Sequence, residues 1–170
     1  VARSQNLYTM KTKNLLFLFL CCFFFSYAEA APKAKRVVMI ALDGVSVTGV
    51  QNAKTPNLDA LIKEGAVSYS TRIVMPSVTL PNWTSQLLGA GPEVHGVFDN
   101  GWTLDNIKLE AVETDADGYF PSVFKVLKDN VKGIKIAYYY NWAELVYPYN
   151  QKYFDELVFS KNDGYVSAYD

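Results

Sequence analysis

An unbroken apolar run, Val37–Leu42, is the feature that most constrains the fold of this chain. Continuous runs of branched apolar residues are typical of strands buried on both faces of a parallel sheet. Asp43-Gly44 ends the run, and open α/β sheets bind ligands beyond the carboxyl ends of such strands. The position suits a functional carboxylate at Asp43, but taken in isolation these two residues favour an ordinary Asp-Gly turn that caps the next segment.

A helix with clear end signals is expected at residues 55–65. Thr55 is the expected N-cap, Pro56 the first helical residue and Gly65 the residue that follows the last turn. Apolar side chains recur at helical spacing, which predicts a buried stripe of Leu58, Leu61 and Ile62. We interpret this helix as a packing element.

The rest of the chain continues to alternate between strands and helices. We expect strands at 68–74 and 134–140, a helix at 121–130 and a weaker element at 153–159. The helix is expected to bury one face, made of Val123, Phe124, Val126 and Leu127. This order predicts an α/β fold with a mainly parallel sheet. Aromatic residues crowd the last third, where core packing explains them more simply than a sugar-binding platform does.

Residues 1–30 are interpreted as upstream residues followed by a signal peptide. A charged start and an apolar run up to Phe25 precede the cleavage pattern Ala28-Glu29-Ala30. Because the run is shorter than the roughly 20 residues of a membrane-spanning helix, we expect export with cleavage near Ala30. Membrane contact is then limited to export, and an uncleaved anchor is the alternative. Cys21 and Cys22 lie in this run, so residues 31–170 contain no cysteine for disulfides or zinc.

The stretch 76–100 carries the residues that point to chemistry. Thr79 lies between Pro76 and Pro81, directly before a helical pattern that ends at Gly89. This places the Thr79 hydroxyl at a helix N-terminus, where free N–H groups and the helix dipole favour a phosphate. Taken alone, the local pattern favours a plain threonine N-cap.

The chain resembles the alkaline phosphatase superfamily over about residues 36–142, and within it the type I phosphodiesterase/nucleotide pyrophosphatase branch. The motifs that carry the resemblance are, in order, Asp43-Gly44 after an apolar strand, Thr55-Pro56-Asn57-Leu58-Asp59-Ala60-Leu61 with Gly65, Pro76-x-x-Thr79-x-Pro81-Asn82, and Gly91-Pro92-Glu93-x-His95-Gly96-x-x-x-Asn100. The sulfatase branch needs Cys or Ser in place of Thr79 and Arg in place of Trp83, so it is disfavoured. Many phosphodiesterase relatives carry His in place of Trp83, which leaves the substrate preference open.

The resemblance implies a three-layer α/β/α fold with a mainly parallel central sheet, of which this chain would be the N-terminal part. It implies two Zn²⁺ ions, with Asp43 as a ligand of one and Thr79 as both a ligand of that ion and the nucleophile. Asn100 would hold a non-bridging phosphate oxygen, and His95 would be structural, with zinc ligation as the alternative. The expected reaction is hydrolysis of phosphodiesters or nucleotide pyrophosphates through a phosphothreonine intermediate.

Two other functions stay open: a catalytically dead exported binding protein, and a phosphomonoesterase of the same superfamily. The family's other zinc ligands include histidines, and no histidine follows His95, so we expect these ligands beyond residue 170. Residues 31–170 would then be the N-terminal portion of a catalytic domain, inactive by itself. The expected partner is a small phosphate ester. A net charge of −1 without a basic patch argues against a nucleic-acid scaffold, and the oligomeric state is not indicated.

Overall fold

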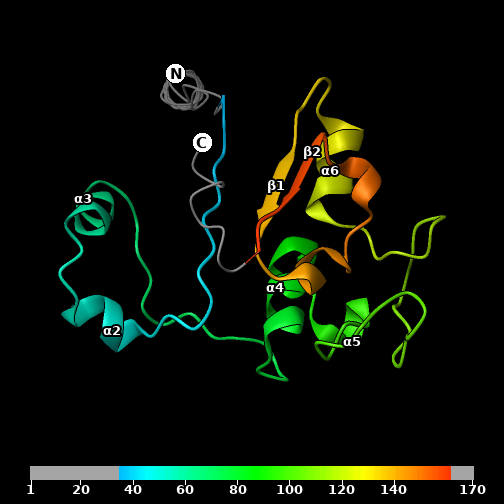
Figure 1. Cartoon of the computed structure of the whole chain (residues 1–170), viewed down its shortest axis with the longest axis horizontal. Helices are drawn as coiled ribbons and strands as arrows, with labels where there is room; N and C mark the ends of the chain where they lie inside the picture. The colour runs from blue at the N-terminus through cyan, green and yellow to red at the C-terminus, as the bar shows by residue number, and fades with distance from the viewer. Residues whose placement is uncertain (1–34, 162–170) are drawn as a thin grey trace, which may run out of the picture. The chain divides into compact units, whose positions relative to one another are not determined.

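The computed structural model describes residues 35–161 of the chain. The chain divides into two units, Val1–Leu42 and Asp43–Asp170. All helices and strands of the described residues belong to the second unit (Figure 1). In chain order they are α2 (Val47–Asn52), α3 (Pro56–Glu64), α4 (Thr79–Leu88), α5 (Pro92–His95), α6 (Val123–Asn130), β1 (Ala137–Tyr140), the 3₁₀ helices η1 (Ala143–Val146) and η2 (Gln151–Tyr153), and β2 (Glu156–Phe159).

The strands β1 and β2 pair in parallel, with Ala137 opposite Glu156 and Tyr140 opposite Phe159 (Figure 1). Parallel neighbours need a crossover connection, which here contains η1 and η2. Helices combined with a small parallel sheet confirm the predicted α/β class. β1 is shorter than the strand predicted at 134–140, and β2 forms within the weaker element predicted at 153–159. The three-layer arrangement stays a prediction.

The prediction of a buried strand at Val37–Leu42 is wrong for the described structure. No strand forms there, and Val37 is 86% exposed and Ile40 81% exposed. Such a strand is buried only when other strands pair with it and further layers cover both faces. Among residues 35–161, β1 and β2 pair only with each other, so no described strand pairs with this run.

Residues 43–75 contain helices but little burial. α3 begins at Pro56 and ends before Gly65, as predicted, but its predicted buried stripe is wrong because none of its residues is buried and Leu61 is 69% exposed. The strand predicted at 68–74 does not form.

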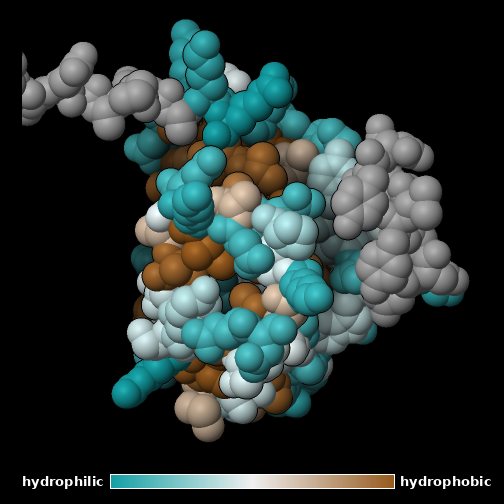
Figure 2. Space-filling view, turned by 90° about the vertical axis from the view of Figure 1, so that its left-hand side faces the viewer, coloured by the Kyte–Doolittle hydropathy of each residue, from teal (hydrophilic) through white to brown (hydrophobic). Residues whose placement is uncertain are grey.

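Apolar side chains from α2, α3 and residues 66–69 line an open groove instead. Figure 2 likewise shows hydrophobic side chains exposed between hydrophilic ones. Periodicity predicted which α3 side chains share a face, but a face is buried only if another element covers it.

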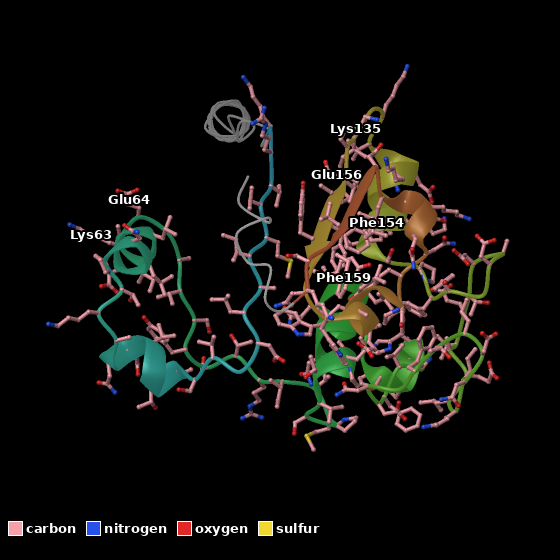
Figure 3. The ribbon with its side chains drawn as sticks, in the orientation of Figure 1. Lys63, Glu64, Lys135, Phe154, Glu156 and Phe159 are labelled. Atoms are coloured by element: carbon pink, nitrogen blue, oxygen red, sulfur yellow. The ribbon has the colours of Figure 1, made fainter. Side chains whose placement is uncertain are left out.

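The main core lies around α6 and the strands. Phe124, Ile136 and Tyr149 are its buried centre, and Tyr138 and Phe154 pack against them. The Phe124 and Tyr149 rings meet edge to face with centroids 5.4 Å apart, and Tyr138 stacks on Phe154 at 5.2 Å. Phe154 is labelled in Figure 3. Aromatic pairs of this geometry contribute about 1 kcal/mol each beyond the burial of their area. The aromatic-rich last third therefore supplies core packing, as the simpler interpretation expects.

α6 begins later than predicted but ends at the predicted residue, Asn130. The Ser122 hydroxyl accepts a hydrogen bond from the backbone N–H of Lys125 at 3.3 Å, so Ser122 is the N-cap. Only part of the predicted face is buried. Phe124 is buried and Leu127 packs against the core, whereas Val123 and Val126 are exposed, because the covered stripe is narrower than predicted.

A second buried cluster fixes the start of α4. It consists of Leu80, Val97 and Trp102, with Leu104, Tyr119 and Trp142 packed against it. Leu80 is fully buried and directly follows Thr79, so packing holds the first turn of α4 in place. None of the helices described between residues 35 and 161 has the length and hydrophobicity to cross a membrane. The predicted signal peptide lies outside the described residues.

Candidate active site

The first turn of α4 presents Thr79 at a helix N-terminus, as predicted. Val78 is the N-cap residue, in extended conformation, and its side chain makes no capping hydrogen bond. Thr79 is therefore the first helical residue, and the alternative of a plain threonine N-cap is wrong. Pro81 occupies the third helical position, where its missing N–H has no intrahelical partner to lose. Gly89 ends the helix with a left-handed φ of 67°, which glycine adopts without strain.

The structure brings Asp43 to Thr79 across 36 residues of sequence. The Thr79 hydroxyl donates a hydrogen bond to Asp43 Oδ2 at 3.2 Å. The other carboxylate oxygen, Oδ1, accepts from the backbone N–H of Gly44 at 3.0 Å. Gly44 has a φ of 70°, so the turn that aims Asp43 at Thr79 favours glycine at this position. The result is an exposed carboxylate with a fixed orientation beside a half-buried hydroxyl.

Asn100 also reaches the start of α4. Its Oδ1 accepts a hydrogen bond from the backbone N–H of Leu80 at 2.8 Å. With the oxygen facing Leu80, the amide nitrogen is left for other acceptors, and it donates no hydrogen bond to the described residues. The backbone N–H of Thr79 likewise has no acceptor among residues 35–161. The start of α4 thus has two N–H donors without an acceptor among the described residues, the Thr79 N–H and Asn100 Nδ2, and such donors could bind an oxyanion.

Asn82 is a residue of this site whose role the sequence reasoning missed. Its Oδ1 accepts from the backbone N–H of Val74 at 2.9 Å, and its Nδ2 donates to the carbonyls of Val78 at 2.8 Å and Pro76 at 3.3 Å. One side chain therefore ties the irregular segment before α4 to the helix. Asn82 belongs to the family motif, but the local signal for its role is an asparagine one turn after Thr79, because asparagine side chains often bond nearby backbone groups.

His95 has a structural role and is buried away from the exposed Asp43 carboxylate. It is 1% exposed, and its Nδ1 accepts from the backbone N–H of Val97 at 3.0 Å. The proton must then sit on Nε2, which donates to Ser85 Oγ at 2.9 Å, and Ser85 in turn donates to the Pro81 carbonyl at 2.7 Å. Burial lowers the pKa of His95 to about 4, against a smaller opposing effect of Glu93. A neutral His95 thus ties α5 to Ser85 in the second turn of α4, and Ser85 in turn bonds Pro81 in the first turn.

Oxygen atoms at this site could hold part of a metal coordination shell. Asp43 and Thr79 offer a carboxylate and a hydroxyl oxygen within 3.2 Å of each other. Within residues 35–161, no three side chains of His, Cys, Asp or Glu gather closely enough to hold a metal ion. His95 is not available as a ligand, because both of its ring nitrogens bond within the protein. A complete metal site would therefore need ligands from outside the described residues.

Comparisons with known proteins point to one family. The sequence model of the family described as type I phosphodiesterase / nucleotide pyrophosphatase matches residues 37–167. The proteins named ectonucleotide pyrophosphatase/phosphodiesterase family member 3 from Rattus norvegicus and Mus musculus are each 29% identical to the chain over 110 residues. That stretch is 61% of this chain and 13% of each relative, so the chain spans a small part of their length. No solved structure matches the chain.

Proposed function

The chain belongs to the type I phosphodiesterase/nucleotide pyrophosphatase family, and on that premise we propose that the complete protein is a zinc-dependent hydrolase of phosphate esters. Its substrates would be small phosphodiesters or nucleotide pyrophosphates, in keeping with the names of the rodent relatives. The observation that carries the proposal is the contact between Thr79 and Asp43, distant in sequence and joined at 3.2 Å. It gives a helix N-terminus both a nucleophile and a carboxylate that orients it.

In the proposed reaction, Thr79 Oγ1 is the nucleophile. As its proton leaves to solvent, Oγ1 forms a bond to phosphorus, and the bond between phosphorus and the leaving-group oxygen breaks. The leaving group takes a proton from water, and the phosphoryl group stays on Thr79 as an ester. A water molecule then attacks phosphorus and gives up a proton, the bond between phosphorus and Oγ1 breaks, Oγ1 takes a proton, and the phosphate product leaves. This two-step route replaces one difficult displacement by two easier ones.

The N–H donors beside Thr79 would stabilise the phosphoryl oxygens. Asn100 Nδ2 is left free to donate because Oδ1 is held by the Leu80 N–H, and the Thr79 N–H lies at the positive end of the α4 dipole. Donors fixed before the reaction need no reorganisation when negative charge concentrates on the equatorial oxygens. We therefore assign substrate binding to Asn100 and to the Thr79 backbone, with no proton transfer required of either.

In the proposed site, Asp43 and Thr79 would hold one zinc ion. Their oxygen atoms lie 3.2 Å apart, and carboxylate oxygen is a common zinc ligand in proteins. Zinc bound there would lower the pKa of the Thr79 hydroxyl and supply an alkoxide nucleophile at neutral pH. We propose that the remaining ligands, including those of a second zinc ion, come from parts of the complete protein outside residues 35–161.

Export is part of the proposal. A signal-peptide pattern occupies residues 10–30, and the names of the rodent relatives begin with "ecto". N-terminal sequencing of the mature protein tests this, with Ala31 as the expected first residue. A mature protein that keeps residues 10–30 would contradict cleavage.

The function is tested by replacing Thr79 in the complete protein with valine and with serine. Valine keeps the shape but removes the hydroxyl, so hydrolysis of bis-p-nitrophenyl phosphate should fall by roughly 10³-fold or more. Serine keeps a hydroxyl and should retain much more activity. Zinc content measured by elemental analysis checks the metal independently of turnover. Normal hydrolysis by the Thr79→Val variant would rule out Thr79 as the nucleophile, and a wild-type protein without zinc would rule out the metal.

A further inference from the structure

We propose that Asn82 is a positioning residue for Thr79, because it and Asn100 hold the two peptide groups that flank the nucleophile. Asn82 Nδ2 donates to the Val78 carbonyl at 2.8 Å, and Asn100 Oδ1 accepts from the Leu80 N–H at 2.8 Å. The Val78 carbonyl belongs to the peptide group that precedes Thr79, and the Leu80 N–H to the one that follows it. The inference rests on the proposed role of Thr79.

The hydrogen bond from Asn82 Nδ2 to the Val78 carbonyl sets the direction of the Thr79 N–H. A peptide group is planar and trans, so a fixed carbonyl places the N–H of the same group on the opposite side. The Asn82 side chain, together with the longer bond of 3.4 Å from the Asn82 backbone N–H to the same carbonyl, thereby orients the Thr79 N–H, the donor that we assign to a phosphoryl oxygen. The Asn100 contact fixes the next peptide group in the same way. With both peptide groups held, the φ and ψ angles of Thr79 are restricted. The position of its Cβ atom, from which the hydroxyl projects, is therefore restricted too.

The segment before α4 depends strongly on Asn82. Residues 66–78 form no helix or strand, so regular secondary structure does not hold them. Asn82 satisfies the Val74 N–H at 2.9 Å and the Pro76 carbonyl at 3.3 Å in addition to its bond to Val78. The backbone bond from Val78 N–H to the Pro76 carbonyl, at 2.9 Å, closes a small turn within the same segment. Asn82 is the side chain that anchors this turn to α4.

The same contacts occupy both amide hydrogens of Asn82. Asn82-Trp83-Thr84 has the pattern of an N-glycosylation acceptor, in which a sugar replaces one of these hydrogens. Because Nδ2 donates to both Val78 and Pro76, a glycan would break at least one of these bonds. We therefore expect the active protein to carry an unmodified Asn82, even when a glycosylating host produces it.

The kinetic test compares Asn82→Ala with a matched control, Asn150→Ala, in the complete protein. Asn150 also donates two side-chain hydrogen bonds, to Asp115 and Asp117, and accepts one from the Lys152 N–H. Asn82→Ala should lower kcat by about 100-fold with little change in KM, because misplacing a nucleophile affects the reaction more than binding. Asn150→Ala should leave kcat near the wild-type value. Equal effects of the two variants on kcat would overturn the proposal, as would an active protein glycosylated at Asn82.

Hydrogen exchange measured by NMR gives a second test that needs no activity. In the wild-type protein, the Val74 N–H and the Asn82 side-chain amide protons should exchange slowly. In Asn82→Ala, the Val74 N–H should exchange as fast as an open loop, while Asn150→Ala leaves it slow. Fast exchange of the Val74 N–H in the wild-type protein would refute the proposal that Asn82 holds this segment, even if the Asn82→Ala variant does not fold. If the wild type hydrolyses no phosphate ester, the proposed function fails, and exchange alone then decides whether Asn82 holds this segment.

Discussion

Replacing His95 by glutamine should remove one specific component of the acid sensitivity of the fold. His95 is buried, neutral and bonded through both ring nitrogens, to the Val97 N–H and to Ser85. Protonation would place a hydrogen on Nδ1 against the Val97 N–H, so the folded state disfavours the charged ring. Glutamine has no charge to gain at any pH, and therefore serves as a reference that does not titrate.

The expected magnitude follows from the two pKa values of the imidazole. Its usual pKa is 6.5, and burial lowers the folded-state pKa to about 4, with the nearby Glu93 carboxylate opposing that effect only in part. Below pH 6.5 the unfolded chain therefore takes up a proton that the folded chain does not. Stability is lost as the pH falls from 6.5 to about 4, with no further loss from this group below that. The full difference is about 3 kcal/mol, which partial solvent screening reduces to about 2 kcal/mol.

The assay is urea unfolding followed by tryptophan fluorescence, at a series of pH values between 8 and 4. The difference in unfolding free energy between the wild type and His95→Gln should be constant above pH 7 and shrink by about 2 kcal/mol by pH 4. Carboxylates with lowered pKa values, such as Asp99 and Asp115, affect both proteins equally and cancel. If the difference in unfolding free energy between the two proteins does not change with pH, the claim that His95 is buried and neutral is refuted.

Two further substitutions probe the donor at the site and the capping of α6. Asn100→Ala should lower kcat for bis-p-nitrophenyl phosphate by about 100-fold, because one fixed donor to the phosphoryl oxygens is lost. An unchanged kcat would show that Asn100 does not bind the phosphoryl group. Ser122→Ala should lower the free energy of unfolding by about 1 kcal/mol in urea titrations, because the hydrogen bond to the Lys125 N–H that caps α6 is lost. The neighbouring substitution Val123→Ala, at an exposed position, is its control and should cost less.

Local signals in the sequence predicted several elements well. Thr55, Pro56 and Gly65 predicted the bounds of α3, and Pro56 is the first helical residue as expected. The Thr55 side chain makes no capping hydrogen bond, however, and Gly65 has a φ of −116° rather than a left-handed one. Thr79 was likewise placed at the start of α4, although Val78 rather than Thr79 proved to be the N-cap. The approach of Asp43 to Thr79 was expected from the family resemblance, and the structure joins the two side chains.

Features that depend on distant partners could not be predicted from local patterns. The apolar run Val37–Leu42 has the composition of a buried strand, yet burial requires paired strands and covering layers that the sequence of the run does not encode. The hydrogen bond from the Val74 N–H to Asn82 and the one from the Leu80 N–H to Asn100 could not be predicted from periodicity. In each, a single side chain bonds one backbone group, and no repeating pattern in the sequence marks such a contact. Their roles became visible only once donors and acceptors were assigned in space.

The most direct test of the central claim is to trap the covalent intermediate in the complete protein. The enzyme is mixed with a p-nitrophenyl phosphate ester, quenched with acid within the first turnover, digested and analysed by mass spectrometry. The account predicts a phosphoryl ester on the peptide that contains Thr79, localised to its side chain and missing in Thr79→Val. Turnover with the phosphoryl group on another residue, or without any covalent adduct at early times, would contradict it.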